Sequence, residues 1–315
     1  MVTDELEVVR RPQAADPSRH GWLAGLLARL VDPFRRGQPP ERQPAMGFYT
    51  DTTVCIGCKA CEVACKQWNQ LPADGFEFTG NSYDNTWELS ASSWRHVKFV
   101  EQFADVLTPA PSANGRLSLS VLPSEPPINR WLMMSDVCKH CVAAPCQQAC
   151  PTGAIVYNEF GNVYIQPDIC NGCGYCVAAC PFGVITRSMI SGHAGKCTLC
   201  YDRQKDGLVP ACAKACPTAS IQFGPIEALR QRARQRVEDL HRRGIADAYV
   251  YGDTPTETYT ELHSFYLLVD RPEIYGLPPD PFNPWIHMTG DYLRTLLVGL
   301  TTIVALLVVF LRGGA

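Results

Sequence analysis

The cysteines of this 315-residue chain fall into four groups of four, and their spacing is the strongest constraint on its fold. The first group, CIGCKACEVACK at residues 55–66, places four thiols within eleven residues. Thiols this close in sequence cannot pair with one another as disulfides without severe strain, because a disulfide requires a particular Cα separation and dihedral angle. They can instead point at one common object. The four groups leave no spare thiol: Cys55, Cys58, Cys61 and Cys65; Cys138, Cys141, Cys146 and Cys150; Cys170, Cys173, Cys176 and Cys180; and Cys197, Cys200, Cys212 and Cys216.

The four groups are repeats of one unit, because each begins with C-x2-C and ends with x3-C. The middle gap is two residues in the first and third groups, four in the second and eleven in the fourth. Proline follows the last cysteine of three groups, where CPTGAIVY, CPFGVITR and CPTASIQF each predict a turn and a short strand; Lys66 follows the first group instead. The run C-x2-C-x2-C-x3-C-P holds iron–sulfur clusters in bacterial ferredoxins. The repeats therefore predict a duplicated ferredoxin-like unit with four [4Fe–4S] clusters.

Structural zinc is the alternative for such thiols, and it would make the chain a structural zinc protein on a membrane. Zinc sites commonly use two C-x2-C pairs separated by a dozen or more residues. The fourth group has a spacing of this kind, but the third group, C-x2-C-x2-C-x3-C-P, does not. Metal analysis of the purified chain separates the two hypotheses.

In two-cluster ferredoxins, the fourth cysteine of each run ligates the other cluster. The second and third groups are joined by AIVYNEFGNVYI at residues 154–165, which predicts a hairpin with its turn at Asn158–Asn162. We expect these two groups to exchange their fourth ligands, and the first and fourth groups are then left to pair. The predicted fold class is therefore α+β, with two interleaved ferredoxin-like modules that hold two [4Fe–4S] clusters each.

The pattern along the chain predicts strands at 93–103 and 130–137 and an amphipathic helix over 226–244 that ends at Gly244. Seven segments follow from these features: an N-terminal extension, partly disordered with a short amphipathic helix, at 1–46; the first part of the first module, with an insertion, at 47–137; the second module at 138–189; the rest of the first module at 190–225; a helix and strand region at 226–275; a linker at 276–291; and a transmembrane helix at 292–311.

Several side chains near the groups are expected to shape the clusters without binding iron. His140 and His193 stand beside cysteine groups, but the thiols already suffice as ligands. Positive charge near a cluster offsets its negative charge and tends to raise its reduction potential. The lysines expected to act in this way are Lys59, Lys66, Lys139, Lys196 and Lys214, and the tryptophans expected to fill the core around the clusters are Trp87, Trp94 and Trp131.

The C-terminal segment YLRTLLVGLTTIVALLVVFL, residues 292–311, predicts a single membrane-spanning helix. From Thr295 to Leu311 it carries seventeen uncharged residues, nearly all apolar. With its flanks, a helix here is about 30 Å long, which is enough for a bilayer. Arg294 and Arg312 bracket the span almost symmetrically, so the distribution of positive charge gives no orientation.

Composition argues against other functions. The formal net charge is −3, and no basic stripe with interleaved aromatic residues appears, so we expect no nucleic-acid partner. The sequence also lacks a Ser/His/Asp set, a glycine-rich phosphate loop and a carboxylate pair in a motif. We therefore expect no catalytic site in this chain.

Four segments resemble the iron–sulfur (beta) subunit of membrane-bound formate dehydrogenase: GFYTDTTVCIGCKACEVACKQWN, SDVCKHCVAAPCQQACPTGAI, DICNGCGYCVAACPFGVI and GKCTLCYDRQKDGLVPACAKACPTASI. The resemblance begins near Gly47 and includes the terminal helix. It implies four crossed ligand sets: Cys55, Cys58, Cys61 and Cys216; Cys65, Cys197, Cys200 and Cys212; Cys138, Cys141, Cys146 and Cys180; and Cys150, Cys170, Cys173 and Cys176.

The resemblance also implies partners and a location. In that family the beta subunit carries electrons from a catalytic (alpha) subunit, whose molybdenum or tungsten bis-pterin site oxidises formate, to a cytochrome b-type membrane (gamma) subunit that reduces quinone. The family usually works at the cell membrane with its soluble part on the outer face. Related subunits serve dimethyl sulfoxide, thiosulfate, polysulfide and nitrite reductases and some hydrogenases, which leaves another catalytic partner as the alternative.

Overall fold

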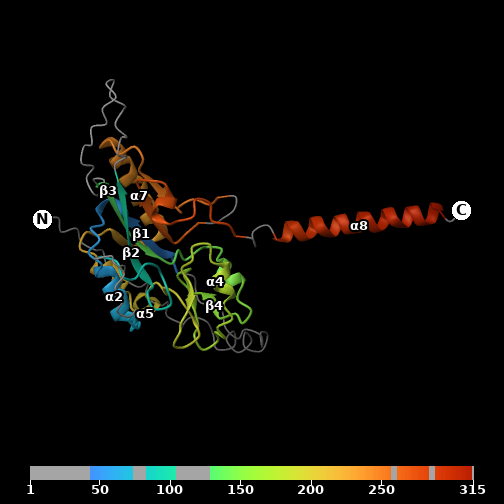
Figure 1. Ribbon diagram of the computed structural model, residues 1–315, viewed down its shortest axis with the longest axis horizontal. Coiled ribbons are helices and arrows are strands. Elements are labelled where there is room, and N and C mark those ends of the chain that lie inside the picture. The colour runs from blue at the N-terminus through green and yellow to red at the C-terminus, as the bar shows by residue number, and fades with distance from the viewer. Residues whose placement is uncertain (1–42, 74–82, 104–127, 257–260, 284–287, 314–315) are drawn as a thin grey trace, which may run out of the picture. The chain divides into compact units, whose positions relative to one another are not determined.

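The computed structural model describes residues 43–73, 83–103, 128–256, 261–283 and 288–313 (Figure 1). Its largest sheet has four strands in the order β8 (Ile221–Pro225), β1 (Met46–Asp51), β10 (Ser264–Leu268) and β9 (Tyr249–Tyr251). The central pair, β1 and β10, is parallel, and each edge strand pairs antiparallel with its neighbour. The helix predicted within the N-terminal extension lies outside the described residues.

The two faces of this sheet are buried against different parts of the protein. Helix α7 (Ile226–Arg242) covers one face, where Tyr49, Phe265 and Leu267 form a core with its apolar side chains. On the other face, Phe48 and Tyr266 belong to the larger core that contains most of the buried cysteines. Because both faces are covered, β10 is a continuous buried run rather than an alternating one. The predicted helix is confirmed, and Gly244, with φ of 88°, follows its end.

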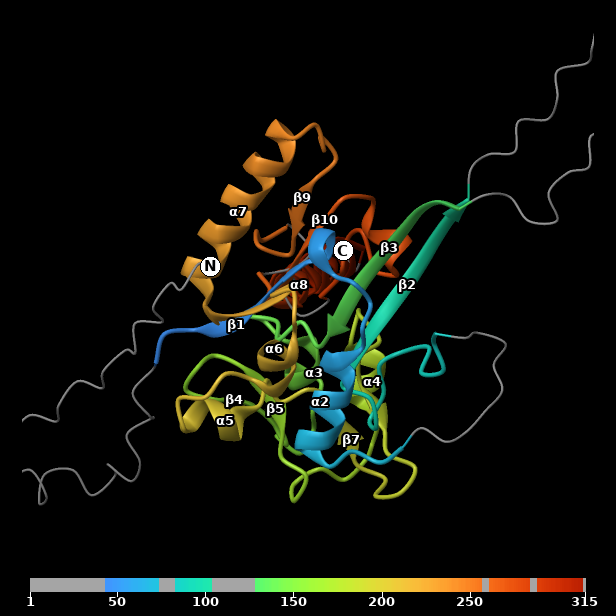
Figure 2. The same ribbon diagram turned by 90° about the vertical axis from the view of Figure 1, so that its left-hand side faces the viewer.

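The remaining strands form three antiparallel pairs (Figure 2). The long pair is β2 (Arg95–Phe103) with β3 (Ile128–Val137), which confirms the strands predicted from sequence. The pair β4 (Ile155–Tyr157) and β5 (Val163–Ile165) confirms the predicted hairpin. At its turn, the side-chain oxygen of Asn158 accepts hydrogen bonds from the backbone N–H groups of Phe160 and Asn162, at 3.1 and 2.8 Å. The third pair is β6 (Thr186–Arg187) with β7 (Ala194–Gly195).

Short helices follow or lie within the cysteine groups. They are α2 (Ala60–Asn69), α3 (Pro145–Gln148), α4 (Tyr175–Ala179), α5 (Tyr201–Lys205) and α6 (Ala211–Ala215), with single 3-10 turns at η2 (Thr52–Val54) and η3 (Pro272–Tyr275). Helices α2 and α6 pack against each other although the first and fourth cysteine groups carry them. This contact brings together parts of the chain that are far apart in sequence.

Two of the three tryptophans expected in the core are not there. Trp87 and Trp131 are 57% and 47% exposed, so that expectation is wrong for both, whereas Trp94 packs against the core. Trp131 lies in the first half of β3, where its ring is 5.6 Å from that of Tyr83 and 6.1 Å from that of Phe99. Trp87 lies in a loop with φ of 64°.

The C-terminal helix α8 (Met288–Gly313) contains the predicted apolar segment. Its stretch Gly290–Arg312 has a mean hydropathy of 2.3, and none of this stretch is buried. An apolar helix of 23 residues that buries no side chains in its own protein is long and apolar enough to cross a membrane.

Candidate metal centres

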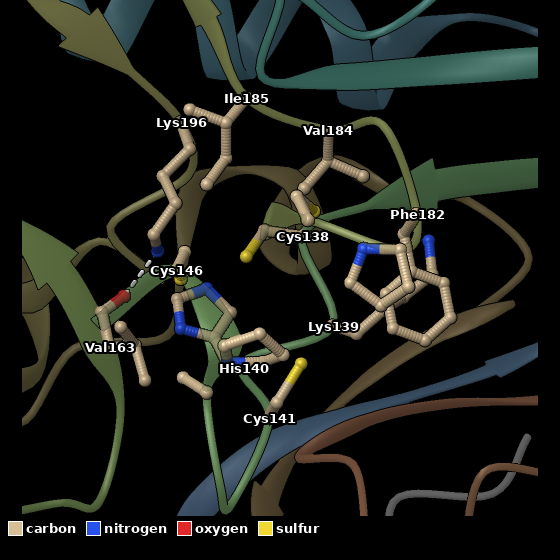
Figure 3. A pocket seen from close by; sticks show the side chains of 14 residues that line it. Cys138, Lys139, His140, Cys141, Cys146, Val163, Phe182, Val184, Ile185 and Lys196 are labelled. Carbon is tan, nitrogen blue, oxygen red and sulfur yellow. Dashed lines mark hydrogen bonds between the residues drawn. The ribbon is translucent and has the colours of Figure 1, made fainter. Parts of the chain in front are cut away.

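The cysteines gather in four sets. Each set combines three thiols of one group with one thiol of another group. Site 3 is formed by Cys138, Cys141 and Cys146 of the second group together with Cys180 of the third, which line one pocket (Figure 3). Apolar side chains, including those of Phe182, Val184 and Ile185, form most of the remaining lining, and Lys139, His140 and Lys196 also line the pocket.

Two further cavities have the same construction. Sites 1 and 4 are pockets that, like site 3, are each lined by four thiols. This shared lining indicates that the three sites suit the same kind of occupant. The thiols that line site 1 are Cys55, Cys58, Cys61 and Cys216, and those that line site 4 are Cys150, Cys170, Cys173 and Cys176.

Site 2 contains the remaining four thiols. Burial raises the pKa of Cys65 well above its usual value, and the neighbouring thiols Cys197, Cys212 and Cys200 act on it in the same direction. Cys65 lies on α2 and Cys212 on α6, the two helices that pack together. The structure therefore places three of the implied sets each around one pocket, and it places Cys65 near Cys197, Cys200 and Cys212.

The loops that carry these thiols share one backbone feature. In the first C-x2-C pair of each group, the residue just before the second cysteine has a left-handed conformation, with φ between 45° and 70°: Gly57, His140, Gly172 and Leu199. Glycine adopts this conformation at no steric cost, whereas histidine and leucine adopt it only where surrounding structure enforces it. The repeated turn directs both cysteines of a pair toward the same cavity.

The thiols are placed to bind a group that supplies positive charge. All sixteen are free, and burial raises the pKa of Cys61 and of Cys146 to about 12. A buried thiolate needs a nearby cation to be stable, because burial disfavours the charged form. Cysteine sulfur is the preferred ligand of iron–sulfur clusters.

The geometry favours a bulky cluster over a single ion. A tetrahedral zinc site holds its sulfur ligands about 2.3 Å from one point. Across the described residues, no group of three or more His, Cys, Asp or Glu side chains is placed to hold one metal ion. In sites 1, 3 and 4, four thiols instead line one pocket together, as the four cysteine ligands of one cluster do.

Of the five lysines that flank the groups, only Lys139 and Lys196 are buried. Lys139 forms an ion pair with Asp136, which also pairs with Lys98 at 3.1 Å. Lys196 lines site 3 and donates hydrogen bonds to the carbonyl oxygens of Val163 and Cys197 (Figure 3). These two lysines therefore contact cluster sites, as predicted, but only the charge of Lys139 is compensated by a carboxylate.

The two histidines differ in their surroundings. His140 lines site 3 with its side chain fully buried, and burial holds its pKa well below the usual value, so the ring is neutral. His193 lies beside site 4, with its Nδ1 atom 2.7 Å from the carbonyl oxygen of Cys170.

One cation near the sites was missed by the sequence reasoning. Arg95 begins β2, far in sequence from any cysteine, and its side chain is fully buried. One of its terminal nitrogens donates a hydrogen bond to the sulfur of Cys212 at 3.3 Å. No local signal in the sequence indicates this contact, because only the folded structure brings β2 beside α6.

Comparison with known proteins identifies the family. Two models described as a 4Fe-4S dicluster domain match residues 54–154 and 129–226. The formate dehydrogenase iron-sulfur subunit of Haemophilus influenzae is 40% identical over 235 residues, which cover 73% of this chain and 68% of that protein. This protein belongs to the formate dehydrogenase iron–sulfur subunit family. Within this family, the nitrate-inducible formate dehydrogenase subunit of Escherichia coli is also 40% identical, over 73% of this chain and 71% of its own length.

A related protein is more distant. An anaerobic dimethyl sulfoxide reductase subunit of Escherichia coli is 33% identical over 187 residues, which cover 59% of this chain and 76% of that protein. Two dicluster domains and sixteen cysteines make [4Fe–4S] clusters the cofactors of this family member. Its function is electron transfer within an oxidoreductase complex. The zinc alternative is wrong.

Proposed function

We propose that this chain carries electrons from a molybdopterin catalytic subunit that oxidises formate to a cytochrome b-type subunit in the membrane. The single observation that carries this proposal is the 40% identity to formate dehydrogenase subunits over most of the chain, against 33% to the dimethyl sulfoxide reductase subunit. Each [4Fe–4S] cluster, when bound, accepts and gives up one electron. The chain itself holds the clusters, shields them from water and presents them to its partners.

The four sites are the proposed cluster sites, with crossed ligation in two interleaved modules. Sites 1 and 2 each combine thiols of the first and fourth groups, and sites 3 and 4 each combine thiols of the second and third. The residues present fit the cofactor, because sites 1, 3 and 4 each offer four thiols and mainly apolar walls. The support is geometric, and iron binding by each set is the claim to be tested.

Contacts between the sites give their order. The Sγ atom of Cys61 in site 1 lies 3.2 Å from the hydroxyl of Ser135, which Arg95 links to Cys212 in site 2. Lys196 touches site 2 through the carbonyl of Cys197 and also lines site 3. Helix α3, which carries Cys146 of site 3, packs against α4, which carries Cys176 of site 4. The sites therefore form a row in the order 1, 2, 3 and 4.

The two ends of this row carry the most exposed thiols, Cys58 in site 1 and Cys173 in site 4. Exposed apolar side chains surround both ends: Ile56 and Val63 lie near site 1, and Ile169 and Tyr175 lie near site 4. Apolar and aromatic residues of this kind are typical of the cores of protein interfaces. We infer that each end docks against another subunit.

The segment that joins Asn283 to α8 indicates which end of the row faces which partner. The side-chain amide of Asn283 donates a hydrogen bond to the carbonyl oxygen of Ala143, between Cys141 and Cys146 of site 3. Five Cα–Cα steps separate Asn283 from the start of α8, a reach of about 19 Å at most. The module with sites 3 and 4 is therefore held near the membrane, site 4 serves the cytochrome, and site 1 serves the catalytic subunit. Following the family resemblance, the proposed location of the soluble part is the outer face of the membrane.

Two surface variants test which end of the row binds which partner subunit. The turn between β6 and β7 carries Met189 and Ile190, both highly exposed, and packs on site 4, where a Cβ atom on Gly172 would lie 2.4 Å from the carbonyl oxygen of Gly192. The double variant Met189→Asp/Ile190→Asp should block haem reduction by formate in membranes while formate still reduces an artificial dye. The matched variant Ile56→Asp, at site 1, should instead weaken binding of the catalytic subunit.

Deletion of the chain tests the substrate. Formate-dependent quinone reduction should disappear from membranes, and the catalytic subunit, if it persists, should still reduce a dye with formate. If formate-to-quinone electron flow survives while dimethyl sulfoxide reduction is lost, the partner is the other reductase and the formate proposal is wrong. If both surface variants leave electron flow intact, the assignment of the two ends is wrong.

A further inference from the structure

Arg95 connects two cluster sites. Its terminal nitrogen Nη2 donates to the sulfur of Cys212 in site 2 at 3.3 Å, and Nη1 donates to the hydroxyl of Ser135 at the same distance. That hydroxyl lies 3.2 Å from the sulfur of Cys61 in site 1. One guanidinium group therefore touches site 2 directly and reaches site 1 through a single hydroxyl.

The position of Arg95 is enforced by its surroundings. The side chain is 2% exposed and is the largest of the fully buried side chains. Nη1 also donates to the backbone carbonyl of Ser135 at 3.3 Å, on the paired strand β3. The guanidinium carbon lies 4.7 Å from the centre of the Phe48 ring on β1. These contacts hold the planar group in one orientation between the two sites.

The charge of Arg95 lacks a carboxylate partner within the part of the chain that the structure describes. Arginine stays protonated in proteins, and an unpaired buried charge is costly. Lys139 differs in this respect, because Asp136 compensates its charge. The charge of Arg95 is therefore available only to the sites beside it.

We propose that Arg95 is a positioning residue shared by sites 1 and 2, and that its charge and hydrogen bonds raise the reduction potentials of both clusters. Reduction adds negative charge to a cluster, so a fixed cation beside two clusters favours the reduced form of each. Hydrogen bonds to cluster sulfur act in the same direction. The proposal rests on the ligand sets given under the proposed function.

The test uses the full-length chain with its clusters, and the readout is a redox titration followed by electron paramagnetic resonance. Arg95→Gln removes the charge. Arg95→Lys keeps the charge but loses the planar set of N–H donors. Arg130→Gln is the control. Arg130 lies on the same strand pair but is paired with Asp270. In Arg95→Gln, two of the four clusters should become at least tenfold harder to reduce, which is a fall of 59 mV for a one-electron couple.

The other two clusters should keep their potentials, and Arg130→Gln should leave all four unchanged. Arg95→Lys should retain full iron content and show a smaller fall than Arg95→Gln. If Arg95→Gln does not retain its clusters, Arg95→Lys decides alone. The proposal then requires that the reduction potentials of two of the four clusters fall, each by less than tenfold in the reduction equilibrium, while the other two stay unchanged.

Unchanged potentials in Arg95→Gln, or an equal shift of all four clusters, would overturn the role of Arg95. A shift of only one cluster would overturn the sharing between sites. An error in the assignment of cysteines to the four sites is detected separately, from the iron content and spectra of cysteine variants that keep Arg95.

Discussion

A charge placed in the middle of α8 tests whether this helix anchors the protein. The stretch Gly290–Arg312 contains thirteen Leu, Val, Ile and Phe residues. At about −0.3 to −0.6 kcal/mol each, they favour membrane insertion by about 4 to 8 kcal/mol. A lysine at the helix centre costs about 3 kcal/mol. Leu300→Lys should therefore weaken insertion about a hundredfold, and Leu300→Lys/Val304→Lys should nearly cancel it.

The assay measures how much of the isolated chain stays on lipid vesicles after washing at high salt, because the cytochrome could retain the chain in the complex. Leu311→Lys is the matched control, since a lysine near a helix end extends to the interface at little cost. The wild-type chain and Leu311→Lys should stay bound, and the double variant should be released with its clusters intact. If the double variant binds as well as the wild type, or if Leu311→Lys is released equally, the anchor reasoning is refuted.

Three further predictions concern the clusters and the core. The purified chain should carry about sixteen irons and as many acid-labile sulfides, and metal analysis that finds zinc with little iron contradicts this. Cys65→Ala should lose the cluster of site 2 and keep that of site 1, about twelve irons in total; spectra that lack the site 1 signal alone would argue against crossed ligation. Burial lowers the pKa of His263 from 6.5 to about 4, with Arg230 adding to the effect, so the folded state favours the neutral ring. The stability that the neutral ring contributes is present above pH 6.5 and is lost as the pH falls toward 4. The free energy of unfolding should therefore fall by about 1.3 kcal/mol between pH 7.5 and 5.5. His263→Gln should remove that part of the pH dependence of the denaturation midpoint, and an unchanged pH profile would show that another group causes it.

The sequence by itself determined the local units of this protein. Cysteine spacing within a group sets which thiols one loop can direct at a cluster, and this depends on a few neighbouring residues. The hairpin around Asn158, helix α7 with Gly244 after its end, and the apolar helix α8 were also predictable. In each case the signal is a turn residue or a hydrophobic period within a short window, so no distant part of the chain is needed to read it.

The tertiary structure decided how these units contact one another. The parallel pairing of β1 with β10 joins strands more than two hundred residues apart, and no local pattern specifies such a partner. Trp131 shares a face of β3 with Ser135, which contacts Cys61, so strand alternation alone predicts a buried side chain. Its 47% exposure depends on where along the strand pair the core ends. Arg95 carries no signal of its role in its own segment. Its charge acts on two sites only because folding removes it from water and places it between cysteines from the first and fourth groups.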